Sequence, residues 1–186
     1  MMQIKGFNNI IKRKMLSILV LIALIFFSIY VIYSRDKYRE IESTDLSTES
    51  IGGLSLMEKY NKKAVEKKFG QLINKLKKNK SYVYQYQSGG SMLLLEVDKD
   101  DNIVKIEVTF GDTSMKTNNG MTKISTLDDI KKAYGSNFLE EEHNDFMGSG
   151  AWQEITYVDK DSMSKITFIL YEYEDWNLGT VILSKY

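Results

Sequence analysis

The sequence predicts an α+β protein. An N-terminal transmembrane helix is followed by two helix-plus-three-strand repeats, which form an antiparallel sheet with the helices on one face. Three observations support this prediction. A run of 19 residues without a charged side chain lies near the N-terminus. Two segments, KKAVEKKFG (62–70) and LDDIKKAYG (127–135), end alike in an aromatic residue and a glycine. Three runs rich in β-branched and aromatic residues follow each segment, as strands would.

The uncharged run, MLSILVLIALIFFSIYVIY, begins at Met15 and ends at Tyr33. A helix needs about 20 apolar residues to cross a hydrocarbon core of about 30 Å, so the run predicts an uncleaved, single-pass signal-anchor. A cleaved signal peptide is the alternative, but its apolar region would span about 7–15 residues and precede small residues. Residues 1–14, which are basic, would form a cytoplasmic tail, and the C-terminal domain would lie outside the cytoplasm.

Residues 34–50, SRDKYREIESTDLSTES, are polar and rich in Ser, Thr and Glu, which predicts a stalk that buries little surface. Residues 51–186 then have the length of one ordinary domain. This domain divides into repeats at about 51–112 and 117–186. The chain contains no cysteine, which excludes a disulfide scaffold and a thiolate metal site.

The first repeat begins with a lysine-rich helix. Apolar residues follow helical spacing from Tyr60 to Leu76, and Gly70 is expected to end or bend the helix, because glycine adopts the left-handed closing conformation without penalty. Strands are then predicted at 81–87, 91–97 and 103–110, separated by SGG and DKDDN turns.

The second repeat begins with a helix that Ser125 or Thr126 is expected to cap and that ends at Gly135. The segment 136–150 is expected to be a loop. Strands are predicted at 151–158, 163–174 and 180–186. In both repeats the aromatic residue would contact the sheet, and the glycine would let the chain turn at once into a strand.

The order of these motifs resembles a known family. A short helix ending in glycine, then YVYQY, then LLLEVDKDDNIVKIEV, is similar to the repeat of the β-lactamase inhibitory protein-like fold, which includes the SmpA/OmlA outer-membrane assembly lipoproteins. The resemblance covers about 51–186 and implies a binding protein or inhibitor rather than an enzyme. Two features depart from the family. The lipidated cysteine is absent, and Gln71 and Ser136 stand where a proline usually follows the helix.

Aromatic and acidic side chains are the candidate partner-binding residues, because Tyr and Trp are enriched at protein interfaces and acidic groups steer basic partners. The three tyrosines of 81–87 alternate, so they share one face of a strand. They either form an open binding surface or pack beneath the helices, and the glutamines between them favour packing. The candidates are Tyr82, Tyr84, Tyr86, Glu140, Glu141, Glu142, His143, Trp152, Tyr171, Tyr173 and Trp176.

Neither a metal site nor a catalytic site is predicted. The segment DKDDNI (98–103) has oxygen-bearing side chains at alternate positions, but Ile103 and Thr109 replace the glycine and glutamate of a calcium loop, so a solvated hairpin turn is expected. His143 is the only histidine, and a zinc site needs three or four ligands. No nucleophile motif, P-loop or dinucleotide fingerprint occurs, so no cofactor is expected.

Charge is unevenly distributed, although the net charge is zero. A nucleic-acid binder would carry a concentrated positive excess, so nucleic acid is not an expected partner. Residues 58–80 contain nine lysines and two acidic residues, and this helix would either contact anionic lipid or present an ordinary solvated face. Residues 136–186 contain ten acidic residues and three lysines.

These observations lead to a membrane-anchored extracytoplasmic protein-binding module, such as an inhibitor or immunity protein that neutralises a secreted protein. The alternative is a structural or assembly subunit of a cell-envelope complex. An enzyme has no supporting constellation of residues.

Overall fold

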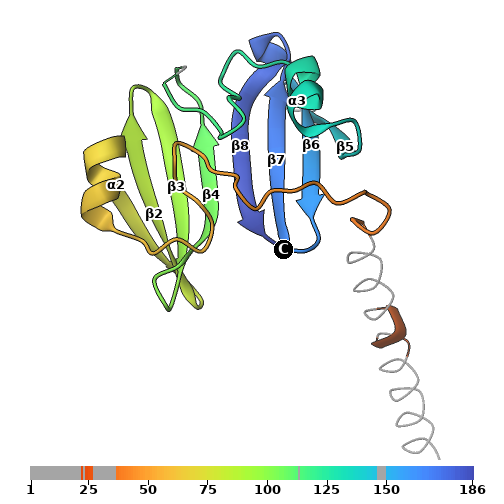
Figure 1. The fold of residues 1–186 in the computed structure, drawn as a ribbon. Coiled ribbons are helices and arrows are strands. Elements are labelled where there is room, and N and C mark those ends of the chain that lie inside the picture. The colour runs from red at the N-terminus through yellow and green to blue at the C-terminus, as the bar shows by residue number, and fades with distance from the viewer. Residues whose placement is uncertain (1–21, 23, 27–36, 113, 146–149) are drawn as a thin grey trace, which may run out of the picture. The chain divides into compact units, whose positions relative to one another are not determined.

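The computed structural model describes residues 22, 24–26, 37–112, 114–145 and 150–186 (Figure 1). The chain divides into two compact units, Met1–Glu40 and Ile41–Tyr186. In the first unit, residues 24–26 are helical. The second unit starts earlier than the predicted domain boundary at 51, because Ile41 and Leu46 are buried within it.

The second unit consists of two similar halves. In each half a short helix is followed by four consecutive strands. The first half contains α2 (Lys62–Phe69), β1 (Leu72–Lys78), β2 (Ser81–Ser88), β3 (Ser91–Asp98) and β4 (Ile103–Thr109). The second half contains α3 (Leu127–Tyr134), β5 (Leu139–Asp145), β6 (Gly150–Asp159), β7 (Ser164–Tyr171), the 3-10 turn η1 (Glu172–Glu174) and β8 (Asn177–Lys185).

All eight strands form one sheet in the order β1-β2-β3-β4-β8-β7-β6-β5 (Figure 1). Every neighbouring pair is antiparallel. Within each half the strands follow one another as a meander. The halves are joined where β4 pairs with β8, so the last strand of each half lies at the centre of the sheet.

The predicted fold class is therefore wrong: the molecule is mostly one eight-stranded sheet, and each helix is followed by four strands rather than three. Residues 72–76 were expected to continue the first helix if Gly70 only bent it, and residues 139–145 were expected to lie in a loop. They form β1 and β5 instead. Both strands lie at the edges of the sheet, and neither shows the apolar alternation that marks a half-buried strand.

A second correction concerns the transmembrane helix predicted for residues 15–33. Among the described residues, no helix is both long enough and apolar enough to cross a membrane, and this contradicts the predicted single-pass architecture. Of the predicted span, the structure describes only Ile22 and residues 24–26. The rest of the span and the predicted tail at 1–14 lie outside the described residues.

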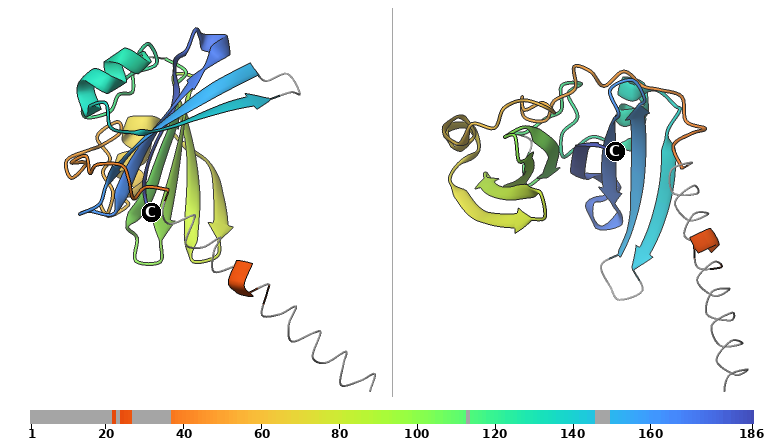
Figure 2. Two further views of the ribbon diagram at one scale, coloured as in Figure 1. Left: turned by 90° about the vertical axis from the view of Figure 1, so that its right-hand side faces the viewer. Right: turned by 90° about the horizontal axis from the view of Figure 1, so that it is seen from below.

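One face of the sheet carries the core. Val65 and Phe69 of α2 and Ile130 and Tyr134 of α3 are buried against it. The two helices and the segment that starts at Ile41 lie on this face (Figure 2). One row of buried side chains crosses six strands in register: Tyr84, Leu95, Ile106, Leu183, Ile166 and Tyr157. This face is called the helix face below.

Both helices end as the repeated aromatic-glycine motif predicts. Gly70 has φ 83° and ψ −172°, and its N–H donates to the carbonyl oxygen of Glu66. Gly135 has φ 93° and ψ −178°, and its N–H donates to the carbonyl oxygen of Lys131. This region of backbone conformation is almost restricted to glycine. It lets the chain leave each helix directly into an edge strand.

Candidate partner-binding face

The opposite face of the sheet, called the open face below, is lined by every second residue of each strand. Strand pairing places these residues in rows across the sheet. One row contains Val83, Glu96, Lys105, Ser184, Lys165 and Val158. The next contains Gln85, Leu94, Glu107, Ile182, Thr167 and Thr156. The open face thus mixes charged, hydroxyl and aliphatic side chains, whereas the helix face of the six inner strands is mostly apolar. On the β6–β7 side of the open face, Val158, Thr156 and Thr167 are buried.

The open face is hollowed over its central strands. The sheet is strongly bent (Figure 2), and a shallow hollow of about 500 Å³ lies over the strands at and beside the β4–β8 junction. Two aliphatic side chains, Ile182 and Val104, lie among charged and hydroxyl groups. The hollow is lined by Glu96, Val104, Lys105, Glu154, Lys165, Thr167, Ile182, Ser184 and Lys185.

Ion pairs and hydrogen bonds hold the polar side chains of the open face in place. Lys105 Nζ lies 2.7 Å from Glu107 Oε2. Glu96 accepts hydrogen bonds from Ser81 Oγ at 2.7 Å and from Lys78 Nζ at 3.0 Å. Burial alone would raise the pKa of the Glu96 carboxyl, but these two hydrogen bonds and the positive charges of Lys78 and Lys105 together outweigh it and hold the pKa below its usual value. The carboxylate therefore stays charged and oriented at neutral pH.

An aromatic group occupies the β5–β6–β7 end of the open face. His143, Trp152 and Tyr171 lie opposite one another on these three strands. The His143 and Trp152 rings are stacked, with centroids 4.9 Å apart. Trp152 Nε1 donates to Glu154 Oε1 at 3.1 Å, and His143 Nε2 lies 3.5 Å from the same oxygen. Glu154 therefore orients the Trp152 ring and lies beside that of His143, and it also lines the hollow.

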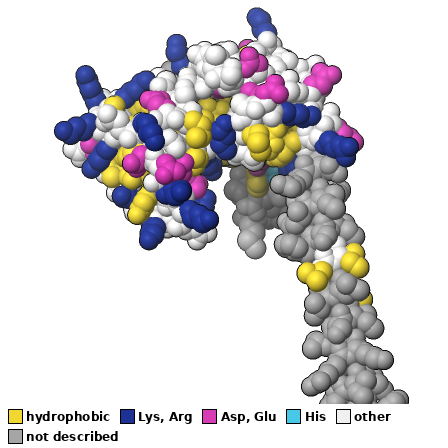
Figure 3. Space-filling model, turned by 60° about the horizontal axis from the view of Figure 1, so that its bottom comes forward, with side chains coloured by type: hydrophobic (Ala, Val, Ile, Leu, Met, Phe, Trp, Pro, Cys, Tyr) yellow, Lys and Arg dark blue, Asp and Glu magenta, His cyan; other side chains and the backbone are white. Residues whose placement is uncertain are grey.

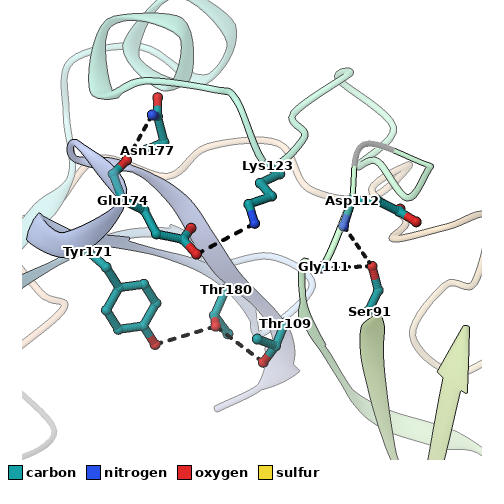
Figure 4. A network of polar contacts seen from close by, with 9 residues as sticks. All are labelled: Ser91, Thr109, Gly111, Asp112, Lys123, Tyr171, Glu174, Asn177 and Thr180. Atoms are coloured by element: carbon teal, nitrogen blue, oxygen red, sulfur yellow. Dashed lines mark hydrogen bonds and ion pairs between the residues drawn. The ribbon is translucent and has the colours of Figure 1, made fainter. Parts of the chain in front are cut away.

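Polar contacts also connect the two halves of the sheet (Figure 4). The Tyr171 hydroxyl lies 3.4 Å from Thr180 Oγ1, and Thr180 Oγ1 lies 3.3 Å from Thr109 Oγ1. This chain of hydroxyls extends from β7 across β8 to β4. It links the aromatic group to the centre of the sheet, and Glu154, which bonds Trp152, also lines the hollow.

The structure divides the predicted partner-binding residues into groups. Glu141, His143, Trp152 and Tyr171 lie on the open face. Tyr173 and Trp176 are exposed beside it, in and after η1, and the Tyr173 ring contacts that of Tyr171 at a centroid distance of 5.1 Å. Glu140 and Glu142 lie on edge strand β5 but face the helix side. His143, expected in a loop, is on a strand and half-buried.

The tyrosines of β2 belong to the helix face. Tyr84 and Tyr86 are buried, so they present no surface to a partner, whereas Tyr82 is 37% exposed. The Tyr86 hydroxyl is hydrogen-bonded to that of Tyr60 at 2.5 Å, and burial raises the pKa of both groups. The Lys75 ammonium lies 4.2 Å from the centre of the Tyr82 ring. This cluster stabilises the first half of the sheet.

Sequence reasoning missed most of the open face. The predicted candidates included none of the residues that line the hollow, such as Ile182, Glu96 and Lys105, nor Leu94, which lies in the same row as Ile182. Their signal was the alternation within strands: in β3, buried and half-buried residues alternate from Ser91 to Asp98. That alternation shows two faces but does not say which one is left uncovered.

The described residues contain no group of His, Cys, Asp or Glu side chains that could hold a metal ion. The DKDDN segment is a hairpin turn in which Asp98 accepts hydrogen bonds from the backbone N–H groups of Asp100 and Asn102 at 2.8 and 2.9 Å. The lysine-rich segment 58–80, a candidate for lipid contact, is not one helix, because its last lysines belong to β1 and the turn after it.

Comparison with known proteins does not assign the chain to a family. No family model matches the sequence, and no curated protein matches it. A cysteine-rich secretory protein from Staphylococcus aureus is similar in structure, with a TM-score of 0.46, 12% identity and 69% of this chain covered. This chain spans 44% of that protein's length. A DUF4309 family protein from Bacillus subtilis has a TM-score of 0.43 and 17% identity, with 82% of this chain and 92% of that chain covered.

Proposed function

We propose that residues 41–186 form a non-catalytic protein-binding module that holds its partner against the open face of the sheet. The hollow over the β4–β8 junction is the observation that carries this proposal. It combines the aliphatic side chains of Ile182 and Val104 with charged groups, of which Glu96 and Lys105 are held by ion pairs. Interfaces of this kind bury an apolar core inside a polar rim. Side chains on strands are also already ordered, which reduces the entropy lost on binding.

The aromatic end adds the second element of such an interface. Trp and Tyr are enriched among the residues that contribute most to binding between proteins. Trp152 is held by its stacking on His143 and its hydrogen bond to Glu154. A partner that covers the hollow would reach these rings, because they lie on the same face.

The hydroxyl groups on this face favour recognition over catalysis. Thr156 and Thr167 bond to each other at 2.9 Å, and Thr109 bonds to Thr180. These hydroxyls are thus engaged in linking neighbouring strands. Such a module could inhibit a secreted protein, because the surface of the partner that binds in the hollow would no longer be accessible to other molecules.

The test compares two variants of the full-length chain in affinity capture from the proteins of the source cells and their medium. Ile182→Arg places a charge in the hollow. Ile124→Arg makes the same change at an exposed position in the loop before α3 and serves as the matched control. Melting curves by circular dichroism should show that both variants fold.

We expect one partner to be captured by the wild-type chain and by Ile124→Arg, and to be lost with Ile182→Arg. If Ile182→Arg retains every captured protein, the open face is not the binding surface. If the wild-type chain captures no protein in an amount comparable to its own, the protein-binding function itself is contradicted.

A further inference from the structure

The two edges of the sheet have opposite charge. β1 and β5 each pair with one neighbour in the described part of the chain, so each has one side without a strand partner. Both strands are seven residues long. Residues 72–80, which comprise β1 and its turn, contain four lysines and no acidic residue, and β5 reads LEEEHND. Lys and Arg side chains are most numerous at the end of the molecule that carries α2, β1 and β2 (Figure 3).

Strand direction allows the two edges to pair with each other. Neighbouring strands are antiparallel throughout, and an even number of strands separates the two ends. β1 and β5 therefore run in opposite directions. If a second copy stands beside the first with the same face forward, its β1 is antiparallel to β5 of the first. The sheet then continues from one copy to the next without a break in its alternation.

Charge also selects this pairing. Lys75 and Lys77 lie opposite Tyr84 and Tyr82, on the helix face. Glu142 and Glu140 lie on the same face, because their neighbours on β6 do. An antiparallel register that sets Lys75 against Glu142 also sets Lys77 against Glu140. Opposite charges directly across a strand pair are stabilising, and like charges are destabilising. Two β1 edges, or two β5 edges, would oppose like charges.

The lysines of β1 could serve only to prevent pairing with other strands, but this role does not explain the apolar residues on the same edge. Charged side chains on edge strands often prevent unwanted pairing. On β1, however, Ile73 and Leu76 are 53% and 57% exposed, so the edge also carries apolar surface. A strand laid against β1 would cover part of that surface.

We propose that the chain assembles head to tail, with β1 of one copy pairing antiparallel with β5 of the next. Such a contact joins two different surfaces, so it forms a ring if the rotation between copies closes and a filament if it does not. The contact leaves the open face unoccupied, so this inference is independent of the proposed binding function. It supports the structural-subunit role that the sequence left as an alternative.

Charge reversal provides the test, with sedimentation velocity of the full-length chain as the measurement. A mild detergent should be present throughout, so that association through the uncharged run at 15–33 does not contribute to the measurement. The double variant Lys75→Glu/Lys77→Glu has two acidic edges. The double variant Glu140→Lys/Glu142→Lys has two basic edges. The control, Lys63→Glu/Lys67→Glu on exposed positions of α2, changes the net charge as the first variant does but leaves both edges intact.

We expect the wild-type chain and the control to form oligomers that dissociate as salt shortens the screening length from about 10 Å at 0.1 M to about 3 Å at 1 M. Each edge variant alone should have a dissociation constant at least about tenfold higher than that of the wild type, because two attractive charge pairs become repulsive. An equimolar mixture of the two variants should recover association. A wild-type chain that stays monomeric overturns the proposal, as does an edge variant that alone associates like the wild type.

Disulfide formation tests the register. The chain has no cysteine of its own, so single cysteines can be placed freely. The proposed register sets Leu76 opposite Glu141. A mixture of Leu76→Cys and Glu141→Cys chains should form the mixed dimer on mild oxidation. A mixture of Leu76→Cys with Lys99→Cys, in the turn between β3 and β4, should not. Equal yields from both mixtures would overturn the proposed edge pairing.

Discussion

Alanine substitution of the two helix-ending glycines separates backbone strain from steric overlap. Gly70 and Gly135 have nearly the same conformation, with φ of 83° and 93°. A residue with a side chain pays about 1–3 kcal/mol to adopt this region. A Cβ on Gly135 would have no atom within 4 Å, so that cost is the whole effect there. A Cβ on Gly70 would lie 2.7 Å from the carbonyl oxygen of Gln87 on β2.

Gly70→Ala should therefore destabilise the protein more than Gly135→Ala does. Because the overlapping atom is backbone, β2 itself must shift, and overpacking of this kind costs about 1 kcal/mol or more beyond the conformational cost. We expect Gly135→Ala to lower the free energy of unfolding by about 1–3 kcal/mol. Each kcal/mol corresponds to a fall in Tm of about 2–4 °C for a domain of this size.

The measurement is urea and thermal unfolding of the full-length chain, followed by circular dichroism. Circular dichroism reports on both halves of the sheet. Tryptophan fluorescence would report mainly on the second half, because Trp152 and Trp176 both lie there. Lys132→Ala, at an exposed position of α3, is the control and should change stability by less than about 0.5 kcal/mol. The reasoning is refuted if Gly135→Ala matches this control, or if the two glycine variants lose the same stability.

Three further predictions concern buried polar groups. Glu49 is buried and accepts a hydrogen bond from the Tyr134 hydroxyl at 2.8 Å, so Glu49→Ala should cost about 2–4 kcal/mol in urea unfolding, and more than Glu49→Gln does. Tyr157→Phe removes the hydrogen bond to the carbonyl oxygen of Gly135 and should cost about 1 kcal/mol; no loss of Tm would show that this bond is not stabilising. Stability should also fall at both extremes of pH. Burial alone would raise the pKa of Asp159, but hydrogen bonds from Ser162, Leu46 and Asp161 outweigh it and lower the pKa. The contribution of Asp159 is therefore present above pH about 4 and is lost as pH falls through the lowered pKa. Burial raises the pKa of Tyr157 to about 12, so its contribution is present below pH about 10 and is lost as pH rises towards 12. A Tm that is constant from pH 3 to 11 would contradict both assignments.

Sequence patterns located the six inner strands but not the two outer ones, for a physical reason. An inner strand such as β3 alternates buried and half-buried residues, and this alternation is visible in the sequence. On β1 all residues but the first are exposed, so no alternation is imposed on the edge strand. The spacing of Leu72, Ile73 and Leu76 also fits one face of a helix, which made the predicted helix too long.

The candidate site was predicted in part. Trp152 and Tyr171 were identified because large aromatic residues are conspicuous, and both lie on the open face. Tyr84 and Tyr86 were candidates for the same reason, yet they are buried. Only the positions of the helices decide between these outcomes. The hollow was missed because aliphatic and charged residues such as Ile182 and Lys105 become a surface only when distant strands pair.

The central position of β8 has a consequence for synthesis of the chain. β4, complete at Thr109, waits for its second neighbour until the ribosome has made the last strand, which ends at Lys185. At about 5–20 residues per second, the roughly 75 intervening residues take about 4–15 s. If the first half folds during that time, its β4 has a bare inner edge that contains Ile106 and Val108. Until β8 is available, this edge can pair with other strands, so it is a surface on the nascent chain that needs protection from premature pairing.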